Sequence, residues 1–300
     1  MEWGSIVDDN LLWWVLAAVA VGVLVPELSV VTDYATPILA VMVGSVSLTL
    51  TVDRFRAVDG RGVAGALVGH VAMPALAFAI AVALDLSPAL VAGFVVLGAV
   101  TPELVTPTMT ELAGGDTALA MVVLVVAGVG ATALVPLALA TFVGDAVAVD
   151  SMAIIEGLAL AVIAPMGAAI GLRHAFDERV GAHEDVYSSV SAVAVIVIIG
   201  GVAAANADLL RDAPALTAVV AAGALALNAA GYGLGYLVGT GGSRETKVAT
   251  TLSVGMRDFA VAAALVVAAG FPTVATLPAV TFGVVELTTS ALLAERLAST

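Results

Sequence analysis

Apolar stretches long enough to cross a lipid bilayer recur along the chain, separated by short polar breaks. A helix needs about 20 apolar residues to cross the hydrocarbon core of a bilayer. We read ten such segments, and no stretch between them is long enough for a soluble domain. They cover about residues 11–31, 34–52, 63–84, 88–112, 117–144, 152–172, 186–206, 214–239, 247–269 and 272–294. The pattern predicts an all-α polytopic membrane protein with ten transmembrane helices.

Two of these segments carry polar residues that a simple membrane anchor would not need. Residues 101–108 read TPELVTPT and residues 253–258 read SVGMRD, each between apolar flanks. Proline removes an amide donor and disrupts a helix. Irregular backbone at membrane depth is tolerated mainly where protein or a water-filled cavity covers it. We therefore predict two broken transmembrane helices.

The two interruptions occupy corresponding places in the two halves of the chain. Their centres, Leu104 and Gly255, are 151 residues apart in a chain of 300. Interrupted segments at matching positions are the best sequence pointer to a transporter binding site. Five spans in each half would give the halves opposite orientations. The prediction is one transporter unit built from inverted five-helix repeats, about 1–150 and 151–300.

Composition and charge agree with a membrane protein and predict its orientation. The chain is 61% hydrophobic and its mean hydropathy is +1.14, far above a soluble domain. Cytoplasmic loops are enriched in Lys and Arg. With ten spans, one side of the membrane would hold Arg54, Arg56, Arg61, Arg173, Arg179, Arg244, Lys247 and Arg296. Only Arg211 would lie on the other side. We predict a multi-pass cell-membrane protein with both termini in the cytoplasm.

The remaining composition excludes several classes of function. Residues 1–10 contain no basic residue, and no small-residue cleavage site follows, so the first apolar segment is expected to be a span and not a signal peptide. The chain has no cysteine, which excludes disulfides and thiolate metal sites. We find no His–carboxylate metal cluster and no Ser/His/Asp arrangement within the spans, and expect neither an enzyme, nor a bound cofactor, nor a nucleic-acid partner. The net charge of −14 fits either a solvated surface suited to high salt or an acidic face that concentrates cations.

Three charged residues at the interruptions are the strongest candidates for function. Glu103, Arg257 and Asp258 would each be costly in hydrocarbon unless paired or solvated. If the two breaks cross near the middle of the membrane, Glu103 can approach Arg257. Either a buried ion pair pins the two helices together, or the charges take part in transport. The full set of candidate substrate- or ion-binding residues is Glu103, Thr101, Thr106, Thr108, Ser253, Met256, Arg257, Asp258, Glu286 and His70.

Each of the weaker candidates has a plain structural interpretation beside the functional one. The threonines can bond to their own helix backbone. Glu286 lies deep in the tenth segment and can line the same cavity as the breaks. His70, among apolar residues, is either a hydrogen-bonded core histidine or a proton relay. Asn228 and Tyr232 are interpreted as packing groups.

Several motifs resemble those of the bile acid:sodium symporter superfamily. Residues 112–120, LAGGDTALA, look like that superfamily's entry to its fifth span, and residues 253–258 are similar to its ninth-span motif EVGMQN. Residues 165–167 and 278–294 also fit its pattern. The resemblance implies ten spans, with panel helices at about 11–52 and 152–206 and core helices at about 63–144 and 214–294. It also implies two unwound helices that cross in the core. Members are secondary carriers, typically of organic anions moved with sodium, and arsenite carriers are related to them.

The chain departs from that family's sodium-binding pattern. The family's Ser-Asn after the first break falls on Thr106-Pro107, and its two fifth-span hydroxyls fall on Ala120 and Leu124. Its ninth-span Glu, Gln and Asn fall on Ser253, Arg257 and Asp258. Its third-span Gln falls near Gly69 or His70. Arg257 thus lies where a sodium site would be, and its guanidinium can substitute for the cation. Three forms of coupling stay open: coupling to sodium bound near Glu103 and Asp258, coupling to protons, and transport that is not coupled to an ion. Arsenite transport through a thiol is not expected, because cysteine is absent.

Three functional hypotheses follow. The leading one is a secondary active transporter that couples Na⁺ or H⁺ to a small organic anion by alternating access, with Arg257 as a partner for the substrate carboxylate. The second is a cation/proton antiporter in which Glu103 and Asp258 bind the ion and Arg257 tunes them. The third is a membrane sensor or scaffold that has kept the fold and lost transport.

Overall fold

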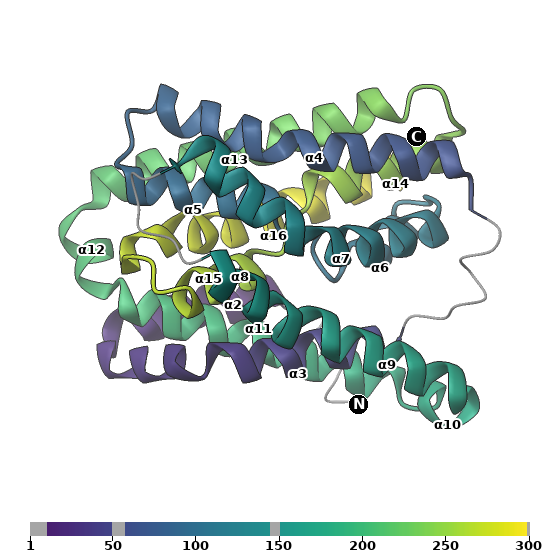
Figure 1. Ribbon diagram of the computed structural model, residues 1–300, viewed down its shortest axis with the longest axis horizontal. Helices are drawn as coiled ribbons and strands as arrows, with labels where there is room; N and C mark the ends of the chain where they lie inside the picture. The colour runs from purple at the N-terminus through teal and green to yellow at the C-terminus, as the bar shows by residue number, and fades with distance from the viewer. Residues whose placement is uncertain (1–10, 50–57, 145–150, 299–300) are drawn as a thin grey trace.

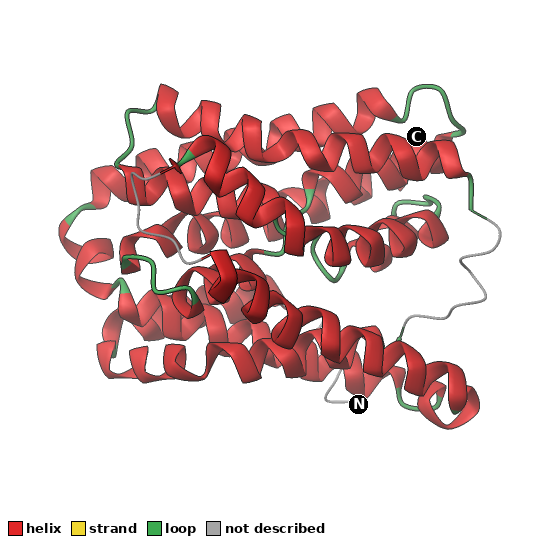
Figure 2. Cartoon of the chain, viewed as in Figure 1, coloured by secondary structure: helices red, strands yellow, loops and turns green. Residues whose placement is uncertain are grey.

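A computed structural model describes residues 11–49, 58–144 and 151–298, and within these ranges every regular element is helical (Figure 2). The elements are α2 (Leu11–Leu24), η1 (Pro26–Tyr34), α3 (Ala35–Ser47), α4 (Gly60–Ala83), α5 (Pro88–Ala99), α6 (Thr106–Leu112), α7 (Thr117–Phe142), α8 (Ser151–Leu158), η4 (Ala159–Ile163), α9 (Ala164–Ala175), α10 (Asp177–Gly181), α11 (Glu184–Ala205), α12 (Ala207–Asp212), α13 (Pro214–Val238), α14 (Arg244–Gly255), α15 (Phe259–Ala268), η5 (Thr273–Thr276) and α16 (Leu277–Ala298). The predicted all-helical class is confirmed.

In the described ranges, eight helices are long and apolar enough to cross a membrane. They are Pro26–Ser47, Gly60–Ala83, Thr117–Phe142, Ile154–Ala175, Val186–Ala205, Pro214–Val238, Arg244–Ala268 and Thr273–Ala298. The predicted first and fourth spans correspond to shorter apolar helices, Leu11–Leu24 and Pro88–Ala99. The multi-pass membrane class is therefore supported, whereas the count of ten spans and the inverted repeat stay predictions. Membrane orientation also stays a prediction, and Arg54 and Arg56, which were used to predict it, lie outside the described residues, as do residues 1–10, on which the expectation of a first span and no signal peptide rests.

One boundary differs from the sequence interpretation. The first span was expected to run to residue 31, but α2 ends at Leu24 and the 3₁₀ helix η1 begins at Pro26. Proline has no N–H to continue the α-helical ladder and restricts the residue before it. Val25 accordingly has φ −126° and ψ 77°, outside the helical region. The chain then continues from η1 into α3 as one apolar helical stretch.

The helices form packed groups that meet around the two interrupted segments. α11 packs against α2, η1 and α3, whereas α13 packs against α4, α14 and α16. In Figure 1, α2, α3 and α11 lie along the lower edge of the view, and α4 and α13 lie along the upper edge. Between them, α5, α15 and α16 contact one another, and α15 also contacts α3. The interrupted helices thus lie in the interior, and a functional division into core and panel helices stays a prediction.

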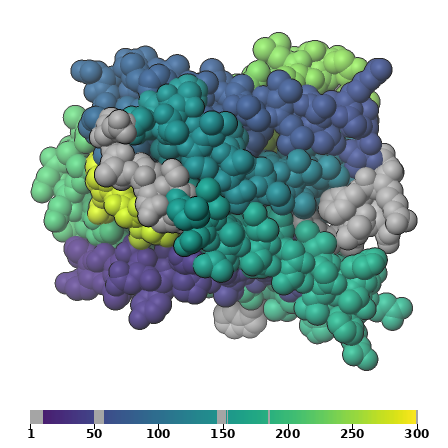
Figure 3. Space-filling model, viewed as in Figure 1, coloured from purple at the N-terminus to yellow at the C-terminus, as the bar shows by residue number. Residues whose placement is uncertain are grey.

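The connection between α9 and α11 extends beyond the rest of the helices. The short helix α10 turns the chain there, and this region projects at the lower right of the space-filling view (Figure 3). Arg173 is buried under this turn and pairs with Asp177 at 2.9 Å and with Glu184 at 2.6 Å. These charge pairs fix the turn at the end of the two helices.

Candidate functional site

The first interruption, which we call the first break, separates α5 from α6. α5 ends at Ala99 and Val100 is extended, with φ −70° and ψ 171°. The helix resumes at Thr106, whose N–H donates to the carbonyl of Glu103 at 2.9 Å. Pro102 and Pro107 have no N–H to donate, so the sequence itself favours an irregular segment here. The predicted break is therefore present, but it covers residues 100–105, and residues 106–108 of the expected segment already belong to α6.

The second break separates α14 from α15. Met256 is extended, with φ −81° and ψ 135°, and Asp258 is the N-cap of the new helix. The Asp258 side chain accepts a hydrogen bond of 2.8 Å from the N–H of Val261. Aspartate is a preferred N-cap because its oxygen satisfies an amide that has no partner in the first helical turn. The sequence of the break thus supplies its own cap.

The two breaks are in direct contact. The N–H of Asp258 donates to the carbonyl of Thr101 at 3.0 Å, and Arg257 Nη1 donates to the carbonyl of Val100 at 3.2 Å. Buried main-chain groups freed by an interruption must find partners. Here each break supplies partners for the other, so the segments that sequence patterns singled out are brought together.

The side chain of Arg257 is fully buried, with 0% of its surface exposed. Its Nη2 donates to the carbonyl of Val254 at 2.9 Å, and its Nη1 contacts both Val100 and the Nδ1 of His70. Val254 lies in the last turn of α14 and Val100 follows the last turn of α5. Helix C-termini carry a partial negative charge. The guanidinium therefore lies at the negative ends of two half-helices.

The expected pairing of Glu103 with Arg257 is wrong, because the described residues contain no ion pair between them. Among those residues, the ion pairs found both belong to Arg173. The Glu103 carboxylate instead accepts hydrogen bonds from the main-chain N–H groups of Leu104 and Phe259. Phe259 begins α15, and the free N–H groups of a helix N-terminus attract negative charge. The acid and the guanidinium are thus held by opposite ends of different half-helices.

Glu286 supports the second break from α16. Its Oε2 accepts a hydrogen bond of 2.7 Å from the main-chain N–H of Arg257. Glu103, Asp258 and Glu286 are all buried, and each has one carboxylate oxygen without a hydrogen-bond partner in the described structure. Glu286 therefore lies beside the second break, and its expected place in the lining of a shared cavity stays a prediction. No group of three or more His, Cys, Asp or Glu side chains in the described ranges could hold a metal ion.

The remaining candidates divide into buried and exposed residues. Those buried at the breaks are Thr101, Thr106, Ser253, Met256 and His70. Thr101 Oγ1 donates to the carbonyl of Pro102 at 2.8 Å, as the local-backbone interpretation expects, and Thr106 Oγ1 lies 3.8 Å from Met256 Sδ. Thr108 differs from the others because its side chain is exposed. Thr108 therefore belongs to the exposed part of the site, whereas the other candidates lie in its buried part.

Asn228 has a polar role that the sequence interpretation missed. Its Nδ2 donates to the carbonyl of Gly255 at 3.2 Å, and its Oδ1 accepts from Thr289 Oγ1 at 2.7 Å. Asn228 thus satisfies a carbonyl at the second break from α13 and links it to α16. The available signal was an amide within an apolar span, because buried amides are almost always hydrogen-bonded.

A cavity of about 230 Å³ lies beside the first break, on the side that faces α3 and α11. Its walls come from the first break, α6 and α7 on one side and from α3 and α11 on the other. The lining residues are Val46, Thr49, Leu104, Val105, Pro107, Thr108, Glu111, Thr117, Met121, Glu184 and Ser188. Leu104 lines the cavity, whereas its neighbour Glu103 is turned toward the N-terminus of α15. The first break therefore separates the cavity from the buried charges.

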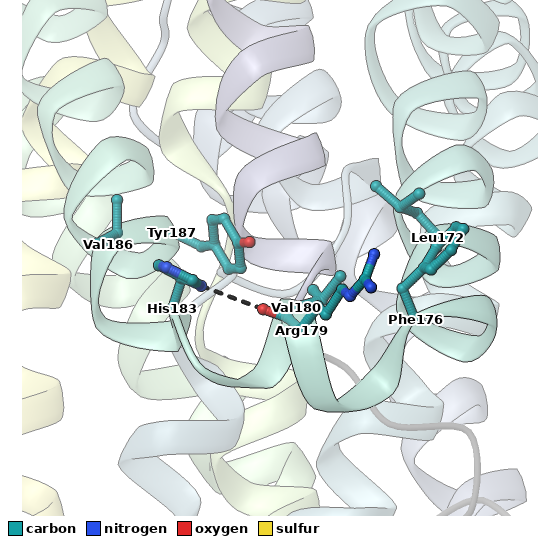
Figure 4. A pocket seen from close by; sticks show the side chains of 7 residues that line it. All are labelled: Leu172, Phe176, Arg179, Val180, His183, Val186 and Tyr187. Atoms are coloured by element: carbon teal, nitrogen blue, oxygen red, sulfur yellow. Dashed lines mark hydrogen bonds between the residues drawn. The ribbon is translucent and has the colours of Figure 1, made fainter.

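A second cavity, of about 420 Å³, lies at the turn between α9 and α11 (Figure 4). Apolar side chains form most of its lining, and His183 Nδ1 lies 3.1 Å from the carbonyl of Arg179. None of the candidate residues at the breaks lines this cavity. Of these two cavities, the one beside the first break is adjacent to the candidate site.

Comparison with known proteins identifies the family. A sequence model of the Sodium Bile acid symporter family matches residues 36–212, which is more than half of the chain. The chain belongs to the sodium bile acid symporter family. The chain also matches the "Uncharacterized sodium-dependent transporter YocS" of Bacillus subtilis (strain 168), with 25% identity over 278 residues, 90% of this chain and 85% of the relative. The resemblance inferred from the motifs is therefore confirmed. For this symporter-family chain, secondary transport is the expected activity.

Proposed function

We propose that the chain is a secondary active transporter that moves a small organic anion by alternating access. The observation that carries this proposal is the contact between two interrupted helices whose charged residues are buried in the interior. Interrupted helices of this kind form the substrate and ion sites of many secondary transporters. The family membership and the description of the bacterial relative as a sodium-dependent transporter support the same activity.

The position of the first break suggests how binding and movement are linked. Leu104, Val105 and Thr108 line the cavity, while Glu103 is bonded to the start of α15 behind it. A substrate that displaces the first break would therefore also change the hydrogen bonds to the second break. In this mechanism the helices around the breaks move against α3 and α11, which form the opposite wall. The division into core and panel helices is part of this proposal.

The chemistry of the cavity wall is compatible with a small oxyanion. Thr108, Thr117 and Ser188 line it, and their hydroxyl groups can donate hydrogen bonds to a carboxylate, whereas the hydroxyl of Thr49 already donates to the carbonyl of Val46 at 2.7 Å. Two carboxylates also line the cavity: Glu184 pairs at 2.6 Å with Arg173, which Asp177 shares, and Glu111 lies on α6, so the proposed anion site is at the hydroxyl groups and away from these acids. Arg257 lies behind the break, and both of its terminal nitrogens already have partners. In the proposed resting state the substrate carboxylate therefore binds to the hydroxyl groups. Arg257 does not contact it, and attracts it only through its charge from the other side of the first break.

The buried carboxylates are the proposed ion-responsive groups. Glu103, Asp258 and Glu286 surround a region that contains one guanidinium, so the cluster holds more acidic than basic side chains. This excess also favours a second candidate function, a cation/proton antiporter that uses Glu103 and Asp258. The symporter family favours the first proposal over the antiporter.

Uptake into proteoliposomes tests the proposal. The purified protein is reconstituted and challenged with a panel of radiolabelled small organic anions under an imposed sodium or proton gradient. The proposal predicts saturable, gradient-driven uptake of at least one anion that is absent from protein-free liposomes. Loss of uptake in Glu103→Ala and Arg257→Ala, with expression retained, supports the site. Cation-driven proton flux without any anion uptake would favour the antiporter, and normal uptake in both variants would refute the site.

A further inference from the structure

The side chain of Arg257 occupies the place where the backbone of the two breaks is best suited to a cation. In transporters with interrupted helices, unwound carbonyls and the C-terminal ends of half-helices coordinate the transported sodium ion. Here the carbonyls of Val100 and Val254, at the ends of α5 and α14, both accept hydrogen bonds from one guanidinium. The charge of Arg257 is also fully enclosed.

The surrounding acids are not grouped into a metal site among the described residues, although each has one carboxylate oxygen without a partner. Glu103 and Asp258 accept hydrogen bonds from N–H groups at the start of α15, and Glu286 accepts one from the main-chain N–H of Arg257. In the described residues, no set of three or more acidic, His or Cys side chains is arranged to hold a metal ion. A sodium ion near the two carbonyls would meet the positive charge of Arg257 at close range in a medium that screens charge poorly.

We propose that Arg257 is a built-in cation that takes the place of sodium at the meeting point of the breaks, so that this chain does not bind sodium there. The inference rests on the proposed function in one respect, namely that this meeting point is the ion site of the transporter. It sets the chain apart from a family whose description names sodium. It also implies that removing the guanidinium while keeping the fold creates a sodium site from carbonyls that are already in position.

Sodium binding to the purified protein tests this proposal without any knowledge of the substrate. Unfolding midpoints are measured in NaCl, KCl and choline chloride at equal ionic strength, together with equilibrium binding of radioactive sodium. The wild type is expected to show the same midpoint in all three salts and no saturable sodium binding. Arg257→Gln, which keeps a polar side chain but is shorter and has no charge, is expected to gain a sodium-specific rise in the midpoint of about 2–4 °C.

Two control variants separate this effect from a general loss of an arginine. Arg257→Lys keeps a cation at the site and is expected not to gain sodium binding. Arg244 also donates to carbonyls at helix C-termini, that of Gly114 just after α6 and that of Leu297 in the last turn of α16, but its hydrogen bonds are exposed. Arg244→Gln is therefore expected to leave the response to sodium unchanged.

The outcomes decide the inference separately from the proposed function. Saturable sodium binding or sodium-specific stabilisation of the wild type overturns the inference, and so does a folded Arg257→Gln variant without any gain. If Arg257→Gln does not fold, binding of radioactive sodium to the wild type decides alone. Anion uptake by a wild type that binds sodium would keep the proposed function and refute only the inference. A wild type that neither binds sodium nor transports any anion would keep the inference and refute the transport proposal.

Discussion

The N–H of Asp258 donates a hydrogen bond of 3.0 Å to the carbonyl of Thr101, and this bond joins the two interrupted helices through their main chains. The same residue caps α15 with its side chain. Asp258 therefore fixes both the start of a helix and its contact with the other break. A displacement of one break cannot leave the other unchanged, because a buried amide and a buried carbonyl would both lose their partner.

The capping role of Asp258 predicts a difference between two substitutions. Asp258→Ala removes the acceptor for the Val261 N–H and should lower the free energy of unfolding by about 0.5–2 kcal/mol. Asp258→Asn keeps an oxygen acceptor and should retain most of the stability. Thermal unfolding in detergent measures both. If Asp258→Asn is stable but fails to transport, the charge of the carboxylate has a role beyond the cap, whereas equal stability of the two variants would contradict the capping argument.

Glu286 is expected to stabilise the second break through a single hydrogen bond. Glu286→Ala leaves the buried N–H of Arg257 without its 2.7 Å acceptor. An unsatisfied buried donor costs about 1–3 kcal/mol, so the unfolding midpoint should fall. Glu286→Gln can still accept this bond and is the matched control. A fall of the same size in both variants would indicate that the charge of Glu286, and not its hydrogen bond, stabilises the protein.

Local chemistry along the chain was enough to predict the broken helices. Pro102 and Pro107 remove amide donors, and Arg257 and Asp258 interrupt an apolar segment, so both breaks could be read from residue types alone. The nearness of Glu286 to the breaks could likewise be expected from its depth in the last segment. These features depend on what one residue does to its own helix.

The partners of the buried charges could not be predicted in the same way. Opposite charges suggested a pair between Glu103 and Arg257, but main-chain groups at half-helix ends compete for both side chains. Glu103 binds N–H groups that include that of Phe259, and Arg257 binds carbonyls that include that of Val254. Which free backbone groups point at a side chain depends on how the helices cross, and residue types do not contain that information. The role of Asn228 was missed for the same reason.

The close approach of α13 to the second break predicts that Gly255 cannot be enlarged. A Cβ atom at Gly255 would lie 2.0 Å from a ring carbon of Tyr232. Forcing an extra methyl into a packed interior costs about 1–3 kcal/mol. Gly255→Ala should therefore lower the unfolding midpoint and disturb transport. Gly233→Ala on α13 is the control, because a Cβ there meets nothing within 4 Å. Equal effects of the two substitutions would show that the contact with Tyr232 is unimportant.

The cavity beside the first break can be tested with single cysteines, because the chain contains none. Thr108 is exposed and lines the cavity, whereas Thr106, two residues earlier on the same helix, is fully buried. Thr108→Cys should react readily with a water-soluble maleimide. Thr106→Cys should react at least about tenfold more slowly, because a buried thiol reacts only when the structure opens locally. The labelling rates of the two purified variants provide the measurement.

The same pair of variants tests whether the cavity takes part in transport. An anion that is taken up by proteoliposomes should slow the labelling of Thr108→Cys, because bound substrate would cover the thiol. It should leave the labelling of an unfolded sample unchanged, which controls for direct effects on the reagent. If saturating substrate does not protect Thr108→Cys while uptake is intact, the substrate does not bind beside Thr108. The transport path would then have to pass the breaks on another side, and the proposed link from the cavity through Leu104 to Glu103 would be lost.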